Sequence, residues 1–190
     1  MSQAALSRIE QTLARVCQRQ DEILERIAKL EVHAAPGGPP TRPEVIAFLD
    51  GFRAFEALGE TSVGTWIARC TTDCLKGGLR TIQMREGTHA DLLEQRIKEL
   101  GGTPSFEVPE AEQREKLECL GSESLSDLEK LQEVVARYPS VDAVVGPIEA
   151  FAARLTNDLE TQSLLQTIAQ DERSSTSFLI DACTQLSGRA

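Results

Sequence analysis

Aromatic residues and histidines are scarce in this chain of 190 residues. Phe, Trp and Tyr make up 4% of the sequence, and His33 and His89 are its two histidines. Strands favour aromatic and β-branched residues, so a sequence rich in Leu, Ala, Glu and Gln indicates helices instead. No run of 18 apolar residues occurs, and the first residues alternate charged with apolar side chains. We therefore expect neither a membrane span nor a secretory signal.

Positive charge is also in short supply, because 20 Lys and Arg stand against 30 Asp and Glu, for a net charge of −10. An acidic surface repels phosphate backbones, so we expect no nucleic-acid partner. The five cysteines lack the spacing of a disulfide framework. Cys70 and Cys74 have no further metal ligands nearby, so we interpret the thiols as reduced and buried. Together these features predict a cytoplasmic protein.

Residues 1–32 carry a heptad pattern of apolar side chains. Four heptads with one polar exception, Gln20, predict a coiled coil that makes the chain a homo-oligomer, most simply a trimer or tetramer. A helix that folds back onto its own domain is the alternative. Residues 33–43 form a linker whose prolines and glycines exclude regular structure. The a and d positions are Leu6, Ile9, Leu13, Val16, Gln20, Ile23, Ile27 and Leu30.

Residues 44–190 alternate long amphipathic helical patterns with capped breaks. Thr-Thr-Asp at 71–73 and Thr-Asn-Asp at 156–158 mark two tight turns, each between two long helices. The pattern predicts an all-α fold with two antiparallel hairpins and a long crossover, an arrangement typical of ferritin-like four-helix bundles. The expected helices cover about residues 44–70, 73–100, 111–120, 125–138, 140–156 and 158–186.

The two hairpins share a weak internal repeat. "LRTIQMREGTHADLL" at 79–93 and "LQTIAQDERSSTSFL" at 165–179 keep Leu, Thr-Ile, Glu and the final Leu at the same spacings. Glu86 and His89 lie inside the apolar stripe of the first copy, and Glu172 lies inside that of the second. Burying such groups without a partner costs several kcal/mol, so we expect them to share a function.

Counting from the first turn places Glu60 opposite Glu86. Glu60 lies about twelve residues before the turn and Glu86 about thirteen after it, so both are about 18–20 Å away along antiparallel helices. His89 follows Glu86 by three residues, and Glu172 has the equivalent height on the last helix. We therefore expect these four side chains to converge and to bind iron or manganese, the usual ions of carboxylate and histidine clusters in bundles.

Two segments, "LGETSVGTW" and "LRTIQMREGTHADLLEQRIKELGG", resemble the ferritin and rubrerythrin superfamily. The resemblance covers roughly residues 44–187. It implies that Glu60 is the glutamate of the first bundle helix, that Glu86 and His89 are the Glu-x-x-His of the second, and that Glu172 is the glutamate of the fourth. The function it implies is iron oxidation or the handling of peroxide.

The resemblance departs from the family pattern at two points. Ser175 stands where the fourth helix often has a second histidine. At the height where the third helix should supply a glutamate, the chain has Val145 or Gly146, with Glu149 and Asp142 one turn to either side. The second half of a two-metal site is therefore expected to be incomplete, so that the chain holds at most one ion.

A metal-free protein is the alternative interpretation. In that case the ferritin-like bundle serves as a scaffold or interaction module, and the coiled coil of residues 1–32 displays several copies of it. Glu86 and His89 would then pair with one of the nearby arginines, which are Arg53, Arg80 and Arg85. The metal content of the purified protein separates the two interpretations.

Overall fold

The computed structural model of the chain describes residues 38–188, and the predicted coiled coil of residues 1–32 lies outside them. The described residues contain helices and no strand, which confirms the all-α class. Each helix begins and ends within a few residues of the range predicted from the sequence. The helices are α2 (Arg42–Arg69), α3 (Asp73–Glu99), α4 (Glu110–Gly121), α5 (Asp127–Arg137), α6 (Val141–Arg154) and α7 (Leu159–Ser187).

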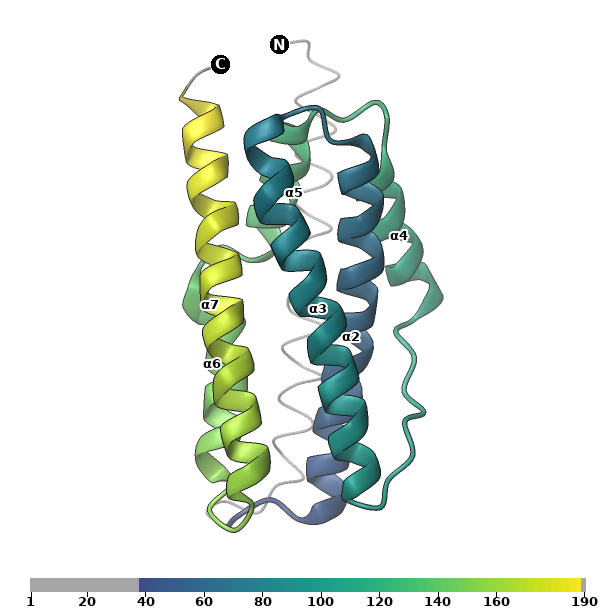
Figure 1. Cartoon of the computed structure of the whole chain (residues 1–190), viewed down its shortest axis with the longest axis vertical. Coiled ribbons are helices and arrows are strands. Elements are labelled where there is room, and N and C mark those ends of the chain that lie inside the picture. Colours follow the sequence, from purple (N-terminus) through teal and green to yellow (C-terminus); the bar gives the residue numbers. More distant parts are fainter. Residues whose placement is uncertain (1–37, 189–190) are drawn as a thin grey trace. The chain divides into compact units, whose positions relative to one another are not determined.

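The four longest helices form two hairpins, α2 with α3 and α6 with α7 (Figure 1). The hairpins meet where α3 packs against α7, and the crossover between them runs through α4, which lies along α2, and α5, which packs on α7. Helix α6 continues through Pro147. None of the described helices combines the length and the apolar character that crossing a membrane requires.

Side-chain hydrogen bonds cap the first turns of α5 and α7. Ser126 accepts a hydrogen bond from the backbone N–H of Glu129, whose carboxylate in turn accepts one from the N–H of Ser126. This reciprocal capping box satisfies two backbone donors at the start of α5. Asp158 plays the capping role for α7, because its Oδ1 accepts from the N–H of Thr161 at 3.1 Å.

Asp127, at the start of α5, also closes the turn between α2 and α3. Its carboxylate accepts hydrogen bonds from the indole N–H of Trp66 at 2.9 Å and from the backbone N–H groups of Thr71 at 3.0 Å and Thr72 at 2.9 Å. Burial by itself would raise the pKa of Asp127, but these donors outweigh it and lower the pKa to about 2. The crossover is therefore fastened to the first turn by a charged hydrogen-bond acceptor.

The apolar interior contains two large clusters with a polar layer between them, and a small third cluster of Ala54, Leu58 and Val108. Along α3, Leu79 and Ile82 belong to one cluster and Leu93 and Ile97 to the other, with the site residues at 86–89 in between. We call the first of these groups the turn core, because it lies at the α2–α3 turn, and the second the distal core. The turn core comprises Val63, Trp66, Cys70, Leu75, Leu79, Ile82, Leu120 and Leu131. The distal core comprises Val45, Leu49, Leu93, Ile97, Val145, Ile148, Ala152, Leu155, Leu165, Ile168 and Ala169.

Candidate metal centre

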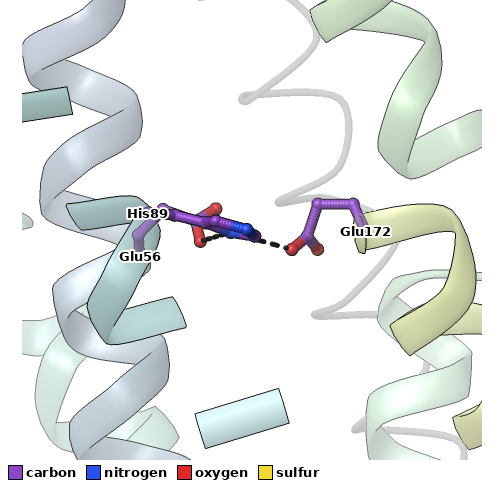
Figure 2. A group of neighbouring side chains, drawn as sticks. All are labelled: Glu56, His89 and Glu172. Atoms are coloured by element: carbon purple, nitrogen blue, oxygen red, sulfur yellow. Dashed lines mark hydrogen bonds and ion pairs between the residues drawn. The ribbon is translucent and has the colours of Figure 1, made fainter. Parts of the chain in front are cut away.

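Three side chains from three helices meet in the polar layer: Glu56 of α2, His89 of α3 and Glu172 of α7 (Figure 2). The Nδ1 atom of His89 lies 2.9 Å from Oε2 of Glu56 and 3.5 Å from Oε1 of Glu172. One ligand atom from each residue lies within 4.8 Å of the other two. This buried group can therefore hold a metal ion between two carboxylates and one imidazole.

Asp171 engages the other nitrogen of the His89 ring. Its Oδ2 lies 3.3 Å from Nε2 of His89, and its Oδ1 lies 3.3 Å from Nε of Arg85. A carboxylate on the far nitrogen of a histidine orients the ring and raises the basicity of the nitrogen that faces a metal. Asp171 thus directs Nδ1 of His89 toward Glu56 and Glu172.

Two glycines let glutamates from the facing helix approach closely. A Cβ atom at position 59 of α2 would overlap the carboxylate of Glu86 from α3. In the same way, a Cβ atom at position 87 of α3 would lie 2.8 Å from the carboxylate carbon of Glu60. Gly59 and Gly87 therefore make room for Glu86 and Glu60, respectively, where α2 and α3 are in contact.

The structure brings together some of the sequence-predicted ligands and separates others. His89 and Glu172 belong to the three-residue group, and Glu86 lies beside it as a partly buried carboxylate. Glu60 is exposed and lies against α3 outside that group, at the height that the count from the turn predicted. The glutamate that α2 supplies is Glu56, one turn earlier, because at Glu60 the helix faces solvent.

The spacing of apolar residues along α2 marks Glu56 in the sequence, although counting residues from the turn does not. It lies seven residues after Leu49 and seven before Val63, and both of these are buried. A residue at that spacing belongs to the same face of the helix. The interruption of an apolar stripe, which singled out Glu86 and His89 on the next helix, therefore identifies Glu56 as well.

Burial and mutual repulsion shift the charges of the site. Burial, with the nearby charge of Glu172, raises the pKa of Glu56 to about 7, although its hydrogen bond to His89 opposes this. Burial, followed by the charges of Glu56 and Glu172, raises the pKa of Glu86 well above its usual value. Burial alone would lower the pKa of His89, but its contacts with Glu172, Glu56 and Asp171 outweigh it and raise the pKa to about 10.

Glu172 carries a buried oxygen that no hydrogen-bond donor satisfies. Among the described residues, its Oε1 is the one buried side-chain oxygen or nitrogen atom that lacks a hydrogen-bond partner, and it faces Nδ1 of His89 at 3.5 Å. Leaving such an acceptor unsatisfied costs about 1–3 kcal/mol, and more when the group is charged. A cation coordinated by Glu56, His89 and Glu172 would satisfy this atom, so the residues present fit a bound metal.

The second half of the site contains an arginine beside Ser175. Ser175, which is buried, accepts a hydrogen bond from Nη1 of Arg85 at 3.2 Å. Of Arg53, Arg80 and Arg85, it is Arg85 that bonds to the polar layer, by its ion pair with Asp171. Its guanidinium therefore lies beside the position of the absent second histidine.

Glu149 and Asp142 do not complete the second half. Both side chains are exposed on α6, and they pair with Arg173 of α7, at 2.9 Å for Glu149 and 3.4 Å for Asp142. Val145 lies at the height expected for a third-helix glutamate and is fully buried in the distal core. Helix α6 therefore contributes an apolar surface to the interior and keeps its carboxylates outside.

Comparison of the chain with protein-family models, with curated proteins and with solved structures finds no match to any of them. The resemblance to the ferritin and rubrerythrin superfamily therefore stays a prediction from short motifs. What the structure adds, for residues 38–188, is a helical fold without strands and a buried Glu56, His89 and Glu172 group that can hold a metal ion.

Proposed function

We propose that this protein binds one divalent transition-metal ion, in the first place iron, through Glu56, His89 and Glu172. The unsatisfied Oε1 of Glu172, which faces His89 beside a second carboxylate, is the observation that carries the proposal. Two carboxylates and one imidazole suit Fe(II) and Mn(II), and they leave coordination positions open. In this proposal α2, α3, α6 and α7 form a ferritin-like four-helix bundle with the ion at its centre.

The charges around the group support a divalent ion. Glu56, Glu86, Asp171 and Glu172 are four carboxylates, and Arg85 is the permanent cation in direct contact with one of them. Metal ligands must be deprotonated, so the ion takes the place of the proton on Nδ1 of His89. Asp171 keeps its hydrogen bond to Nε2 throughout and holds the ring in place.

The reaction that we propose for the iron-loaded protein is iron oxidation or the handling of peroxide, as the resemblance implies. The iron would supply the redox chemistry. Glu56 and Glu172 would stabilise the ferric state by their negative charge, and Glu86 offers a further carboxyl group against Gly59 beside them.

Metal content measured on purified protein tests the proposal. After anaerobic loading with Fe(II), or with Mn(II), and removal of free ion, elemental analysis should find one ion per chain. Glu172→Gln and His89→Ala should each lose it. Glu60→Gln is the matched control, since it removes the same charge from an exposed carboxylate near the site, and it should keep the ion. An unmodified chain without metal, or an equal loss in Glu60→Gln, contradicts the proposal.

A metal-free scaffold is the second candidate, and the basicity of His89 favours it. With a pKa of about 10, His89 is protonated at neutral pH, and its imidazolium is already a cation among Glu56, Asp171 and Glu172. In that state the polar layer would hold the two hairpins together as an internal ion-pair network. The elemental analysis decides between the candidates, because the scaffold retains no ion at neutral pH.

Either candidate includes a homo-oligomer assembled through the coiled coil predicted for residues 1–32. We expect a trimer or tetramer by light scattering, and we expect deletion of residues 1–42 to lower that state without unfolding the helices. A monomeric full-length chain would contradict this assembly. The cytoplasm is the compartment that we propose, since the cysteines of the described residues, Cys70, Cys74, Cys119 and Cys183, are free thiols.

A further inference from the structure

Arg85 reaches across the junction of the two hairpins, from α3 to α7. Its Nη1 donates to Oγ of Ser175 at 3.2 Å, and its Nε lies 3.3 Å from Oδ1 of Asp171. The Arg85 side chain keeps 26% of its surface exposed, whereas Ser175 is buried. The guanidinium is therefore held at the edge of the polar layer by two residues that flank Glu172.

The internal repeat relates this contact to the one between His89 and Asp171. When 79–93 is aligned with 165–179, His89 corresponds to Ser175 and Arg85 corresponds to Asp171. The contact of His89 with Asp171 therefore has a counterpart in the contact of Ser175 with Arg85. The first contact pairs an imidazole, which can bind a metal ion, with a carboxylate anion. The second pairs a hydroxyl group with a guanidinium cation.

We propose that Arg85 is the residue that limits the site to one metal ion, because its guanidinium stands as a fixed cation where a second ion would bind. This inference rests on the proposed function. A cation bonded to Ser175 and Asp171 repels a second metal ion and occupies the space that an imidazole at position 175 would need. Ser175→His alone is therefore insufficient to create a second metal position.

Restoring the repeat at both positions should create that position. In Arg85→Asp combined with Ser175→His, the introduced imidazole gains a carboxylate on its far nitrogen, as His89 has from Asp171. Glu172, three residues before position 175 on α7, and Glu86 of α3 would then be the candidate carboxylate ligands of the second ion. We expect this double variant to retain two ions per chain after loading with Mn(II), whereas the unmodified chain and Ser175→His retain one.

Arg80→Asp combined with Ser175→His is the matched control. It makes the same change of charge on the same helix, but Arg80 is exposed and has no bond to the site. This control should retain one ion. Elemental analysis gives the ion count, and the rise in melting temperature on adding Mn(II) gives a second readout that does not depend on activity. That rise should be larger in the Arg85 double variant than in the control.

Several outcomes would overturn the inference. Two ions in Ser175→His, or in the Arg80 control, would show that Arg85 is no obstacle, and one ion in the Arg85 double variant would show that removing it is not enough. Should Arg85→Asp with Ser175→His fail to fold, Arg85→Gln with Ser175→His replaces it. Failure of both, while the single variants fold, also refutes the idea that the imidazole fits once Arg85 is gone. If the unmodified chain binds no ion, the proposed function itself is refuted.

Discussion

The two hairpins differ most in where they place their acidic side chains. The α2–α3 hairpin directs Glu56 and His89 into the polar layer, with Glu86 alongside. The α6–α7 hairpin directs Glu172 inward but leaves Glu149 exposed, paired with Arg173. The α2–α3 hairpin buries apolar residues on both sides of this layer, whereas the α6–α7 hairpin buries them in the distal core and adds partly buried residues of α7 to the turn core. One helical framework therefore accepts a ligand-rich half and a ligand-poor half without a change of architecture.

The framework tolerates this difference because opposite charges are paired, both across the junction of the hairpins and at the surface. In the ligand-rich half, His89 lies among carboxylates and is the group that a metal ion can use. In the ligand-poor half, Ser175 and Asp171 of α7 contact the permanent positive charge of Arg85, which reaches over from α3. The carboxylates of α6 are matched by Arg173 at the surface, where they need no burial.

Of the changes that test this difference between the hairpins, replacing His89 should lower the free energy of unfolding the most. His89→Ala leaves Glu56 and Glu172 buried without a cation, and removing one partner of a buried ion pair costs about 3–5 kcal/mol. We expect this loss in the free energy of unfolding of the metal-free protein, measured with denaturant above pH 7, where Glu56 is charged. At pH 4.5 the loss should shrink, since Glu56 then takes up a proton. An equal loss at both pH values would contradict the charge argument.

Truncating one core residue from each hairpin should weaken the two halves similarly. Leu79 of the turn core and Ile168 of the distal core are both fully buried, so Leu79→Ala and Ile168→Ala should each cost about 2–5 kcal/mol. Met84 of α3 keeps 67% of its surface exposed, and Met84→Ala, the control, should change stability by less than about 0.5 kcal/mol. Denaturant midpoints measure all three, and a mild Ile168→Ala would indicate that the α6–α7 half packs loosely.

The ligand-rich half should also make stability depend on pH. The folded state raises the pKa of Glu56 from 4.5 to about 7 and that of His89 from 6.5 to about 10, so it binds protons more tightly than the unfolded state. Stability of the metal-free protein should therefore fall as the pH rises, through Glu56 between pH 4.5 and about 7 and through His89 between pH 6.5 and about 10. Unfolding measured with a chelator present checks this, and a rise in stability across the second interval would be inconsistent with it.

Removing the surface arginine of the ligand-poor half should have the smallest effect. Arg173 is 46% exposed, so Arg173→Ala should cost between about 0 and 1 kcal/mol despite two ion pairs. It should also leave the number of bound metal ions unchanged, because Glu149 and Asp142 stay on the surface. A second ion in this variant would show that Arg173 keeps these carboxylates out of the site.

The helices could be predicted from the sequence because their ends carry clear signals. The breaks at Thr71–Asp73 and Thr156–Asp158 are short and polar, and the amphipathic pattern between them is regular. Of the six Leu and Ile residues that the two copies of the repeat share, Leu79, Ile82, Leu93, Leu165 and Ile168 are buried, and Leu179 is partly so. They divide between two cores, however, because the polar layer separates them.

The site could be predicted only in part, and the reason differs between residues. Counting from a tight turn gives the height of a side chain but not its direction, so it brought Glu60 level with Glu86 without showing that Glu60 is exposed. The partners Asp171 and Arg85 depend on how α3 is aligned with α7. A long crossover joins the two hairpins, and no turn geometry sets that alignment.

The turn of the first hairpin depends on a residue that is synthesised later, Asp127. It lies 55 residues after the backbone N–H of Thr72 and 56 after that of Thr71, to both of which it bonds. At about 5–20 residues per second, the ribosome adds those residues in roughly 3–11 s. During that time the turn amides bind water, and Trp66 lacks its indole acceptor. The turn of the nascent hairpin is thus completed only when the start of α5 has emerged.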